Sequence, residues 1–291
     1  MMRNALLFRL GGLGDLLVAF PSVHLIRKKF PSASLTLVCR EEYGALFQET
    51  GVVDRVIRGD SSRLLPLFAG SVAPGKELVE WLRGFDLIVG WTHGQRKDVF
   101  GECRLIYYQP EMPESISRFF FRKTSEALGE GQSIDFSFEE CAKLPLSPAQ
   151  KKGKFVVVHP GSGSEKKCWP MRNFLEIVGR LGQKGVKGAL ITGEAEIRME
   201  ALIKKTALPP GWSWLCSPSL ISLSNLLQEA DLYLGNDSGI THLAAACGTE
   251  VVALFRNEFI TAWRPYGRVH LLSAASLEEI SIDSVWEKIQ F

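Results

Sequence analysis

Three side chains capable of chemistry and one glycine lie close together in the segment 235–246, which reads Gly-Asn-Asp-Ser-Gly-Ile-Thr-His-Leu-Ala-Ala-Ala. They are Asp237, Ser238, Gly239 and His242. The apolar run 230–234 predicts a short buried parallel strand, and the small residues 243–247 predict a helix packed closely on a sheet. N–H groups at the start of such a helix carry partial positive charge, which is typical of a phosphate or pyrophosphate site. The alternative is that Asp237 or Ser238 only caps the helix.

A second loop, 159–170, reads His-Pro-Gly-Ser-Gly-Ser-Glu-Lys-Lys-Cys-Trp-Pro and follows another predicted strand. Its glycines and hydroxyls allow a phosphate to approach closely, and its lysines can neutralise the charge. The alternative is a flexible turn with solvated lysines. His159, at the end of the strand, is either a ligand contact or a structural histidine.

A third loop, 192–196, reads Thr-Gly-Glu-Ala-Glu. A carboxylate there can accept hydrogen bonds from both hydroxyls of a ribose. The alternative is that acidic residues simply favour the start of a helix.

Near the amino terminus, a fourth loop combines Gly11, Gly12 and Gly14 with Asp15. The spacing is not the G-x-G-x-x-G fingerprint of dinucleotide sites, and the next predicted strand ends in Cys39-Arg40 instead of an acid. NAD binding is therefore disfavoured. Asp15 falls in the first turn of a predicted helix, where it either complements the helix dipole or acts as a base.

Strands and helices alternate along the chain, which predicts an α/β fold with two doubly wound domains. The segment 143–154, with two prolines and four lysines, predicts the linker between them, and the segment 64–76 predicts a long loop. The expected strands are 5–10, 35–39, 52–57, 87–90, 104–107, 155–159, 189–192, 230–234 and 251–255. The first expected helix follows the glycine loop and ends at 29, and Pro21 is expected to kink or divide it. The other expected helices span 171–184, 195–205, 221–229, 243–247 and 277–289.

The composition excludes several classes of protein. A length of 291 residues and 46% hydrophobic content suit two cored domains, and a net charge of +2 gives no argument for nucleic-acid binding. The 6 cysteines lack metal-ligand or redox spacing, and no signal peptide or membrane span is evident, so we expect a reduced, cytoplasmic protein. The sequence contains no Asp-x-Asp pair and no histidine cluster with ligand spacing, so no motif indicates a metal site.

Taken together, the motifs resemble glycosyltransferase family 9, the heptosyltransferases of lipopolysaccharide core synthesis. The resemblance rests on Gly-Leu-Gly-Asp at 12–15, on the loops 159–170 and 235–242, and on Trp-Arg-Pro-Tyr-Gly at 263–267. It implies a GT-B architecture, in which two Rossmann-like doubly wound domains face a central cleft. The expected domains are an acceptor-side domain (1–148), a donor-binding domain (149–276) and a terminal helix (277–291) that packs back toward the first.

The resemblance also assigns roles. It implies an inverting, metal-independent transfer of heptose from ADP-heptose to a lipopolysaccharide core acceptor, with Asp15 as general base and no required cofactor. The donor site it implies comprises Ser162, Gly163 and Lys167 at the pyrophosphate, the Ser238 and Gly239 amides as further donors, Glu196 at the ribose, and Asp237 and His242 near the sugar and phosphates.

Two departures from the family pattern bear on these roles. Arg256-Asn257-Glu258 stand where members usually have Gly-Pro, and the chain is short for the family. The candidates for acceptor contacts are the cations Arg58, Arg63, Arg96 and Lys97. The alternative interpretation is that these side chains are ordinary solvated surface charges. Two other functions stay open: a GT-B transferase for another nucleotide sugar, and a non-catalytic nucleotide-sugar-binding protein.

The run Arg-Phe-Phe-Phe-Arg-Lys at 118–123 has two interpretations. Aromatic residues between cations suit the inner face of a membrane, so peripheral contact there is one hypothesis. A core helix with basic flanks is the favoured alternative.

Overall fold

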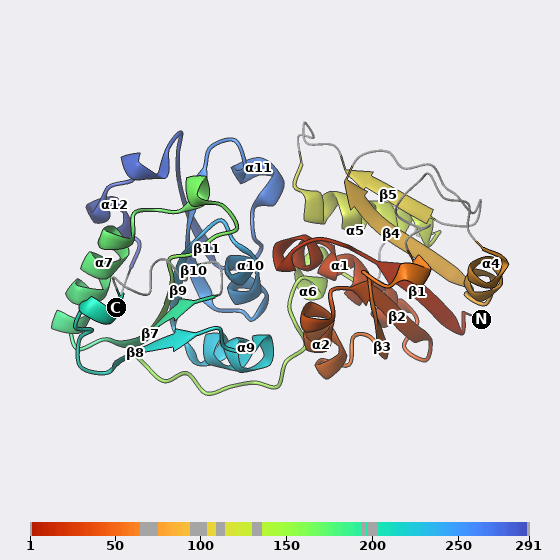
Figure 1. Ribbon diagram of the computed structural model, residues 1–291, viewed down its shortest axis with the longest axis horizontal. Helices are drawn as coiled ribbons and strands as arrows, with labels where there is room; N and C mark the ends of the chain where they lie inside the picture. Colours follow the sequence, from red (N-terminus) through yellow and green to blue (C-terminus); the bar gives the residue numbers. More distant parts are fainter. Residues whose placement is uncertain are drawn as a thin grey trace. The chain divides into compact units, whose positions relative to one another are not determined.

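Two parallel β-sheets organise the chain, one in each of two units, Met1–Pro145 and Leu146–Phe291 (Figure 1). The division falls inside the predicted linker. The computed structural model describes residues 2–64, 75–93, 104–108, 114–129, 136–193, 196 and 203–289. The predicted loop 64–76 and the predicted helix 195–205 lie mostly outside these ranges.

The first unit contains a five-stranded sheet in the order β3-β2-β1-β4-β5, with every neighbouring pair parallel. Its strands are β1 (Asn4–Phe8), β2 (Ser34–Cys39), β3 (Arg55–Arg58), β4 (Leu87–His93) and β5 (Arg104–Tyr108). Its helices are α1 (Leu13–Lys29), α2 (Glu41–Glu49), α4 (Lys76–Arg83), α5 (Ile116–Ala127) and α6 (Phe138–Cys141). The central β1 is wholly apolar after Asn4 because helices cover both faces of a parallel sheet.

Helix α1 is the buried helix of this unit. All residues from Leu16 to Ile26 are buried, and the helix packs against α5 and α6. Pro21 lies inside α1 without dividing it, so of the two predicted effects of this proline, a kink or a division, the division is wrong. Packing on all sides holds the helix together although a proline lacks one backbone donor.

The second unit contains a six-stranded parallel sheet in the order β11-β10-β9-β6-β7-β8. Its strands are β6 (Phe155–His159), β7 (Lys187–Thr192), β8 (Trp212–Cys216), β9 (Leu232–Asn236), β10 (Glu250–Arg256) and β11 (Val269–Ala274). Its helices are α7 (Met171–Gln183), α9 (Leu220–Glu229), α10 (Gly239–Ala246), α11 (Ile260–Trp263) and α12 (Ile282–Trp286). Counted within each unit, both sheets follow the doubly wound order 3-2-1-4-5, which the second extends by a sixth strand.

The sequence did not predict the two outer strands of the second sheet. β8 and β11 lie at the edges, where most residues are only partly buried. An edge strand therefore needs no continuous apolar run, which is the signal that revealed the inner strands.

The carboxyl-terminal segment also differs from its prediction. A single helix was expected over 277–289, but the chain forms a 3₁₀ turn, Leu277–Glu279, and then α12, whose amino end is capped by Ser281. Leu277 and Val285 are buried in the core of the second unit, and Trp169 Nε1 donates to the Ile280 carbonyl at 2.9 Å. The segment is thus part of the second unit.

The aromatic run 118–123 lies on α5 and serves the core of the first unit. Phe120 and Phe121 are buried, and Phe121 meets Phe138 edge-on. The flanking cations pair with acids, as in Arg118 with Glu139 at 2.6 Å. The interpretation as a core helix is confirmed. In the part of the chain that the structure describes, no helix has the length and apolar character to cross a membrane.

Candidate functional site

In the second unit, two loops flank the point where the strand order reverses. They follow β6 and β9, which are neighbours in the sheet although the chain between them forms β7 and β8. Ligands of doubly wound sheets bind at the carboxyl ends of the strands on either side of such a reversal. The loops 159–170 and 236–239, both predicted as phosphate loops, are therefore brought together here.

Asn236, the last residue of β9, ties the two loops to each other. Its side chain is fully buried, donates from Nδ2 to the Pro160 carbonyl at 2.6 Å and accepts from the Trp169 N–H at 3.0 Å. The ring of Trp169 is also fully buried and packs edge-on against Phe174 of α7. Asn236 has no role among the sequence-based predictions; an amide at the end of an otherwise apolar strand was the available signal.

The predicted pyrophosphate residues meet at this junction. Lys167 Nζ lies 2.6 Å from Asp237 Oδ2, and Ser162 Oγ donates to the Asp237 carbonyl at 2.6 Å. The Lys167 side chain is 27% exposed and that of Asp237 only 7%, so the cation faces outward from a buried carboxylate. Gly163, next to Ser162, is exposed, and a Cβ added there would have no atom within 4 Å, which leaves space beside the loop.

Phe259 forms a further wall for Lys167. Lys167 Nζ lies 4.2 Å from the centre of the Phe259 ring, within the range of a cation–π interaction. Phe259 directly follows Arg256-Asn257-Glu258, the residues that depart from the family pattern. Phe259 was not predicted as a site residue, because nothing in the local pattern relates it to Lys167.

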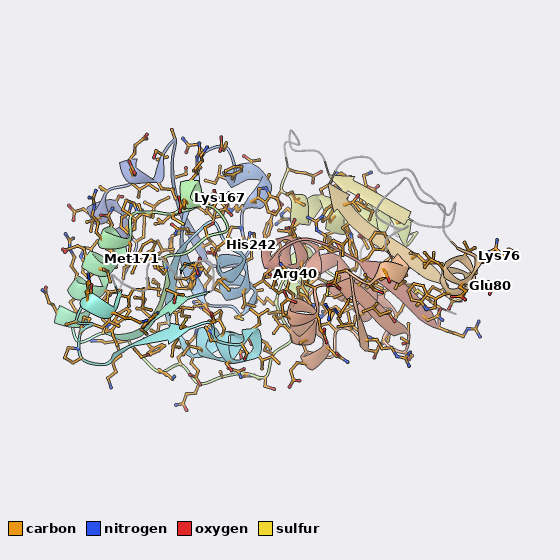
Figure 2. The ribbon with its side chains drawn as sticks, in the orientation of Figure 1. Arg40, Lys76, Glu80, Lys167, Met171 and His242 are labelled. Atoms are coloured by element: carbon orange, nitrogen blue, oxygen red, sulfur yellow. The ribbon has the colours of Figure 1, made fainter. Side chains whose placement is uncertain are left out.

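Helix α10 begins beside the same junction. Ser238 is its N-cap and accepts from the Thr241 N–H at 3.4 Å, so Ser238 does cap the helix, while its predicted role in donor binding stays a prediction. Its hydroxyl also lies 3.4 Å from His159 Nδ1. Because the N–H groups of Gly239 and Ile240 precede the first intrahelical bond, they remain as donors at the helix start. His242 lies buried on the same helix (Figure 2).

Glu196 approaches the first of these loops from the carboxyl end of β7. It is 5% exposed, accepts the Gly193 N–H at 2.6 Å through Oε2, and lies 3.8 Å from His159 Nε2. Burial by itself raises the pKa of Glu196, but the interactions with His159 and the Gly193 N–H outweigh it and lower the pKa. A Cβ at Gly161 would come 2.1 Å from Glu196 Oε1, so a larger residue there would displace the Glu196 side chain. The structure thus places a charged carboxylate against the loop 159–170, which the sequence predicted as a phosphate loop.

In the first unit, the loop after β1 holds Asp15 rigidly. Its Oδ2 accepts the Gly12 N–H at 2.9 Å, and its Oδ1 accepts from Arg9 Nη2 at 2.6 Å. Gly11 has φ of +123°, and a Cβ there would come 2.6 Å from Oδ2. Asp15 therefore does complement the start of α1, as the alternative supposed, while its side chain stays 33% exposed. Gly14, which directly precedes Asp15, lies in the first turn of α1.

A cavity of about 560 Å³ opens beside this loop, at the carboxyl ends of β1, β2 and β3. Its lining is strongly charged and consists of Leu10, Gly11, Arg40, Glu41, Glu42, Arg58, Gly59 and Asp60. Arg58, an acceptor candidate, is exposed there and pairs with Asp60 at 2.9 Å. Of the other acceptor candidates, Arg96 and Lys97 lie outside the described residues, and for Arg63 only the backbone is described.

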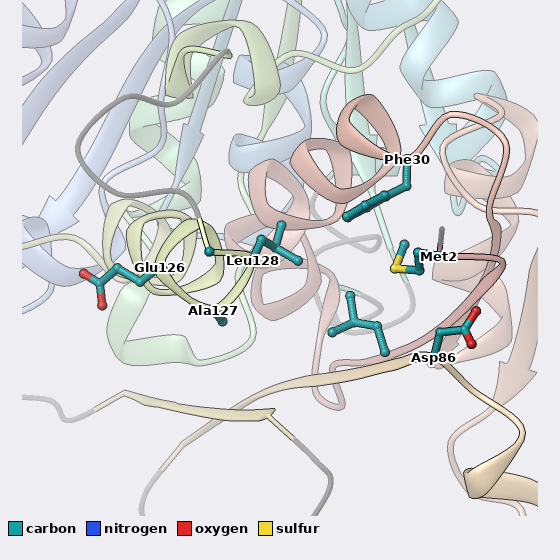
Figure 3. Close-up of a pocket in the computed structure, with 8 residues that line it drawn as sticks. Met2, Phe30, Asp86, Glu126, Ala127 and Leu128 are labelled. Atoms are coloured by element: carbon teal, nitrogen blue, oxygen red, sulfur yellow. The ribbon is translucent and has the colours of Figure 1, made fainter.

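A second cavity of the first unit, of about 660 Å³, lies beside Met2, Phe30, Asp86 and Leu128 (Figure 3). These residues precede β1 and β4 or follow α1 and α5. The cavity is therefore at the amino edge of the sheet, away from the edge where doubly wound folds bind ligands. It is not part of the candidate site.

Within the described ranges, no group of three or more His, Cys, Asp and Glu side chains is arranged to hold a metal ion. Metal independence stays a prediction.

Comparisons with known proteins agree with this architecture. Lipopolysaccharide heptosyltransferase 3 of Escherichia coli is 28% identical over 116 residues, which cover 38% of this chain and 34% of that protein. The match thus spans about a third of the length of this curated relative.

Two solved structures cover almost the whole chain. The glycosyl transferase family 9 protein from Veillonella parvula DSM 2008 has a TM-score of 0.74 at 16% identity and covers 98% of this chain and 96% of its own. E. coli heptosyltransferase WaaC with ADP has a TM-score of 0.70 at 18% identity, with 98% of both chains covered. The predicted fold class, two Rossmann-like α/β domains of the GT-B type, is confirmed.

The model of one protein family matches residues 111–281, a range that includes every loop of the second unit described above. Because that range is more than half of the chain, the match extends well beyond any single motif. The chain belongs to glycosyltransferase family 9 (heptosyltransferase).

Proposed function

We propose that the protein transfers heptose from ADP-heptose to a lipopolysaccharide core acceptor, with inversion at the anomeric carbon. Family membership supports the reaction class, and the curated relative is a lipopolysaccharide heptosyltransferase. The choice of ADP-heptose as donor is supported by the structures of E. coli WaaC, which has been solved with ADP and with ADP-2-deoxy-2-fluoro heptose.

The observation that carries the proposal is the junction of the β6 and β9 loops around Lys167 and Asp237. It combines a partly exposed cation, small residues and the first amides of α10, and the buried Asn236 side chain bonds to the backbone at both ends of the loop 160–169. These are the groups needed to hold a pyrophosphate. Donors that are already oriented stabilise the charge that builds on the departing diphosphate.

The other donor residues surround this junction. Glu196 is a carboxylate able to accept hydrogen bonds from ribose hydroxyls through Oε1, since Oε2 is occupied by the Gly193 N–H. Asp237 and His242 would lie nearer the sugar and the phosphates. On this proposal Lys167 exchanges part of its interaction with Asp237 for the pyrophosphate when the donor binds.

Asp15 is the proposed general base. Its partly exposed carboxylate takes the proton from the acceptor hydroxyl as that oxygen attacks the anomeric carbon, on the face opposite the leaving ADP. The C–O bond to the acceptor forms while the bond to the diphosphate breaks. The charged cavity beside Gly11, with Arg40 and Arg58, is the proposed region for acceptor contacts.

A nucleotide panel tests the donor. The purified protein is heated with ADP, UDP, GDP, dTDP or NAD, without added metal and with EDTA. A ligand at 100 times its dissociation constant stabilises a protein by about 2.7 kcal/mol, enough to raise the melting temperature visibly. We expect a selective shift with ADP, followed by heptose transfer from ADP-heptose to a truncated lipopolysaccharide.

Each other outcome points elsewhere. A selective shift with another nucleotide would keep the transferase class but contradict the ADP-heptose donor. Binding of ADP-heptose without transfer to any core acceptor would favour a non-catalytic nucleotide-sugar-binding protein.

A further inference from the structure

We propose that Arg9 is a positioning residue that holds Asp15 in the orientation required for proton transfer. The inference rests on the proposed role of Asp15 as general base. Arg9 follows β1 directly, at the carboxyl end of the strand, and was not singled out by any motif.

The contacts of Arg9 are those of a fixed cation. It is 5% exposed and donates to three acceptors: from Nε to the Asp15 carbonyl at 3.0 Å, from Nη1 to the Trp91 carbonyl at 3.1 Å, and from Nη2 to Asp15 Oδ1 at 2.6 Å. The guanidinium also lies 5.6 Å from the centre of the Phe120 ring. It therefore connects the start of α1 with β4 and α5.

The supports of Arg9 are themselves rigid. Trp91 is fully buried, and its Nε1 donates to Thr124 Oγ1 of α5 at 3.0 Å. β1 and β4 are the two strands between which the order of the first sheet reverses. The guanidinium thus lies at the position where this fold class places its ligands.

Arg9 and Gly12 together fix both oxygens of the Asp15 carboxylate. Oδ1 is held by the guanidinium and Oδ2 by the Gly12 N–H, and these two contacts set the plane of the group. Each oxygen keeps a second lone pair, and a third of the side chain remains exposed to an approaching hydroxyl. Since proton transfer depends on heavy-atom geometry, an unsupported carboxylate would act more slowly without binding the donor less well.

Burial affects the ionisation of the Arg9 guanidinium. It lowers the pKa of Arg9, and the negative charge of Asp15 opposes that effect. Arg9 and Asp15 therefore depend on each other: without Asp15 the cation would be buried without a counter-charge, and without Arg9 the carboxylate would lose its strongest donor.

A double-mutant cycle tests the inference. Arg9→Gln, Asp15→Asn and the double variant are compared in kcat, in KM for the donor and in melting temperature. We expect Arg9→Gln to lower kcat about 10- to 100-fold with donor KM within about twofold, as expected for a misplaced catalytic group. In the Asp15→Asn background, we expect Arg9→Gln to change kcat by less than about threefold, because its effect acts through the carboxylate.

Arg27 provides the matched control. It lies on α1, donates to the Val52 and Ala33 carbonyls and pairs with Asp54 at 2.6 Å, but it belongs to the last turn of the helix, away from Asp15. Arg27→Gln should lower the melting temperature and leave kcat unchanged.

A second variant, Arg9→Lys, serves if Arg9→Gln proves too unstable. It keeps the positive charge, but the lysine side chain cannot reach Asp15 and Trp91 together. We expect the same loss of kcat and the same non-additivity with Asp15→Asn.

Two results would overturn the role of Arg9: wild-type kcat in Arg9→Gln, or a loss that is undiminished in the Asp15→Asn background. Wild-type turnover in Asp15→Asn alone would instead contradict the base itself. The failure of the inference and the failure of the proposed mechanism are thus told apart by which single variant remains active.

Discussion

At the scale of single residues, the candidate site consists of charged side chains oriented by neighbouring polar groups. Lys167 is oriented by Asp237, Glu196 by the Gly193 N–H, and Asp15 by Arg9 and Gly12. In each case a hydrogen bond or ion pair orients the charged group, while part of the site remains accessible. Such preorganisation lowers the cost of arranging groups around a reacting centre.

Replacement of the proposed base, Asp15, is the most direct test at this scale. Asp15→Asn keeps the shape of the side chain but cannot accept the proton, so kcat should fall about 100- to 10,000-fold, as when a general base is lost. Isothermal titration with ADP should show unchanged affinity, because the proposed donor residues lie in the second unit. Weakened ADP binding of the same size as the loss in kcat would contradict the assignment.

Lys167 is tested by its own removal. Lys167→Ala should weaken ADP binding about 10- to 100-fold, since a hydrogen bond to a charged group contributes about 1.5–3 kcal/mol. The neighbouring Lys166, which is exposed, supplies the matched control Lys166→Ala, for which affinity should stay within about twofold. Equal losses in both variants would mean that the loop attracts ADP only by its overall charge.

The pKa of Glu196 predicts a dependence of stability on pH. Because this pKa is lower in the folded protein than its ordinary value of 4.5, the charged form stabilises the fold above about pH 4.5. The contribution is lost as the pH falls through the lower, folded value. Melting temperatures from pH 7 to pH 3 should show Glu196→Gln less stable than the wild type near neutrality, with the difference shrinking only below about pH 4.5. A difference independent of pH would remove the charge as its cause.

At the scale of elements, the proposed donor site depends on how two separate loops are joined. The residues between β6 and β9 form β7, β8 and α9, yet the loops at the ends of β6 and β9 are neighbours. Asn236 makes this proximity a fixed contact by bonding to the backbone of the other loop. The junction is therefore a property of the strand order and of one buried amide.

Asn236→Ala should loosen the junction. It leaves the Pro160 carbonyl and the Trp169 N–H buried without their partner, at a cost of about 1–3 kcal/mol for each group. Urea denaturation should show this loss of stability, and the affinity for ADP should fall as the loop 160–169 becomes mobile. The exposed Asn257 gives the control Asn257→Ala, which should unfold like the wild type. Wild-type stability of Asn236→Ala would show that the loop is held by other contacts.

At the scale of the whole molecule, each unit has a core of its own. The core of the second unit draws on residues from Val156 to Ile289, including the terminal segment that was expected to pack toward the first unit. The first unit is centred on β1 and the buried α1. Units of this size with separate cores are able to fold independently.

Separate expression of residues 146–291 should therefore give a folded protein that binds ADP but transfers no heptose. Circular dichroism with a cooperative thermal transition would check folding, and titration with ADP would check the donor site. A folded fragment that does not bind ADP would show that the first unit contributes to donor binding.

The sequence by itself determined the class of fold and most of the inner strands, and it singled out the loops that we propose bind the donor. Buried parallel strands require continuous apolar runs, and anion sites require glycines, hydroxyls and cations in short loops, so both leave local signals. The Gly-Asn-Asp-Ser-Gly segment and the loop with Lys167 were recognised in this way. Edge strands β8 and β11, which need no such run, were not.

Only the tertiary structure decided which residues support the reactive ones. Asn236, Phe259 and Arg9 act on groups that strand order and chain folding bring near them, through contacts such as Lys167 with Phe259 and Arg9 with Trp91. Lys167 and Asp237 are 70 positions apart, and Arg9 and Trp91 are 82 apart. Local patterns carry no information about such pairs, because the distance between two side chains depends on the path of the whole chain between them.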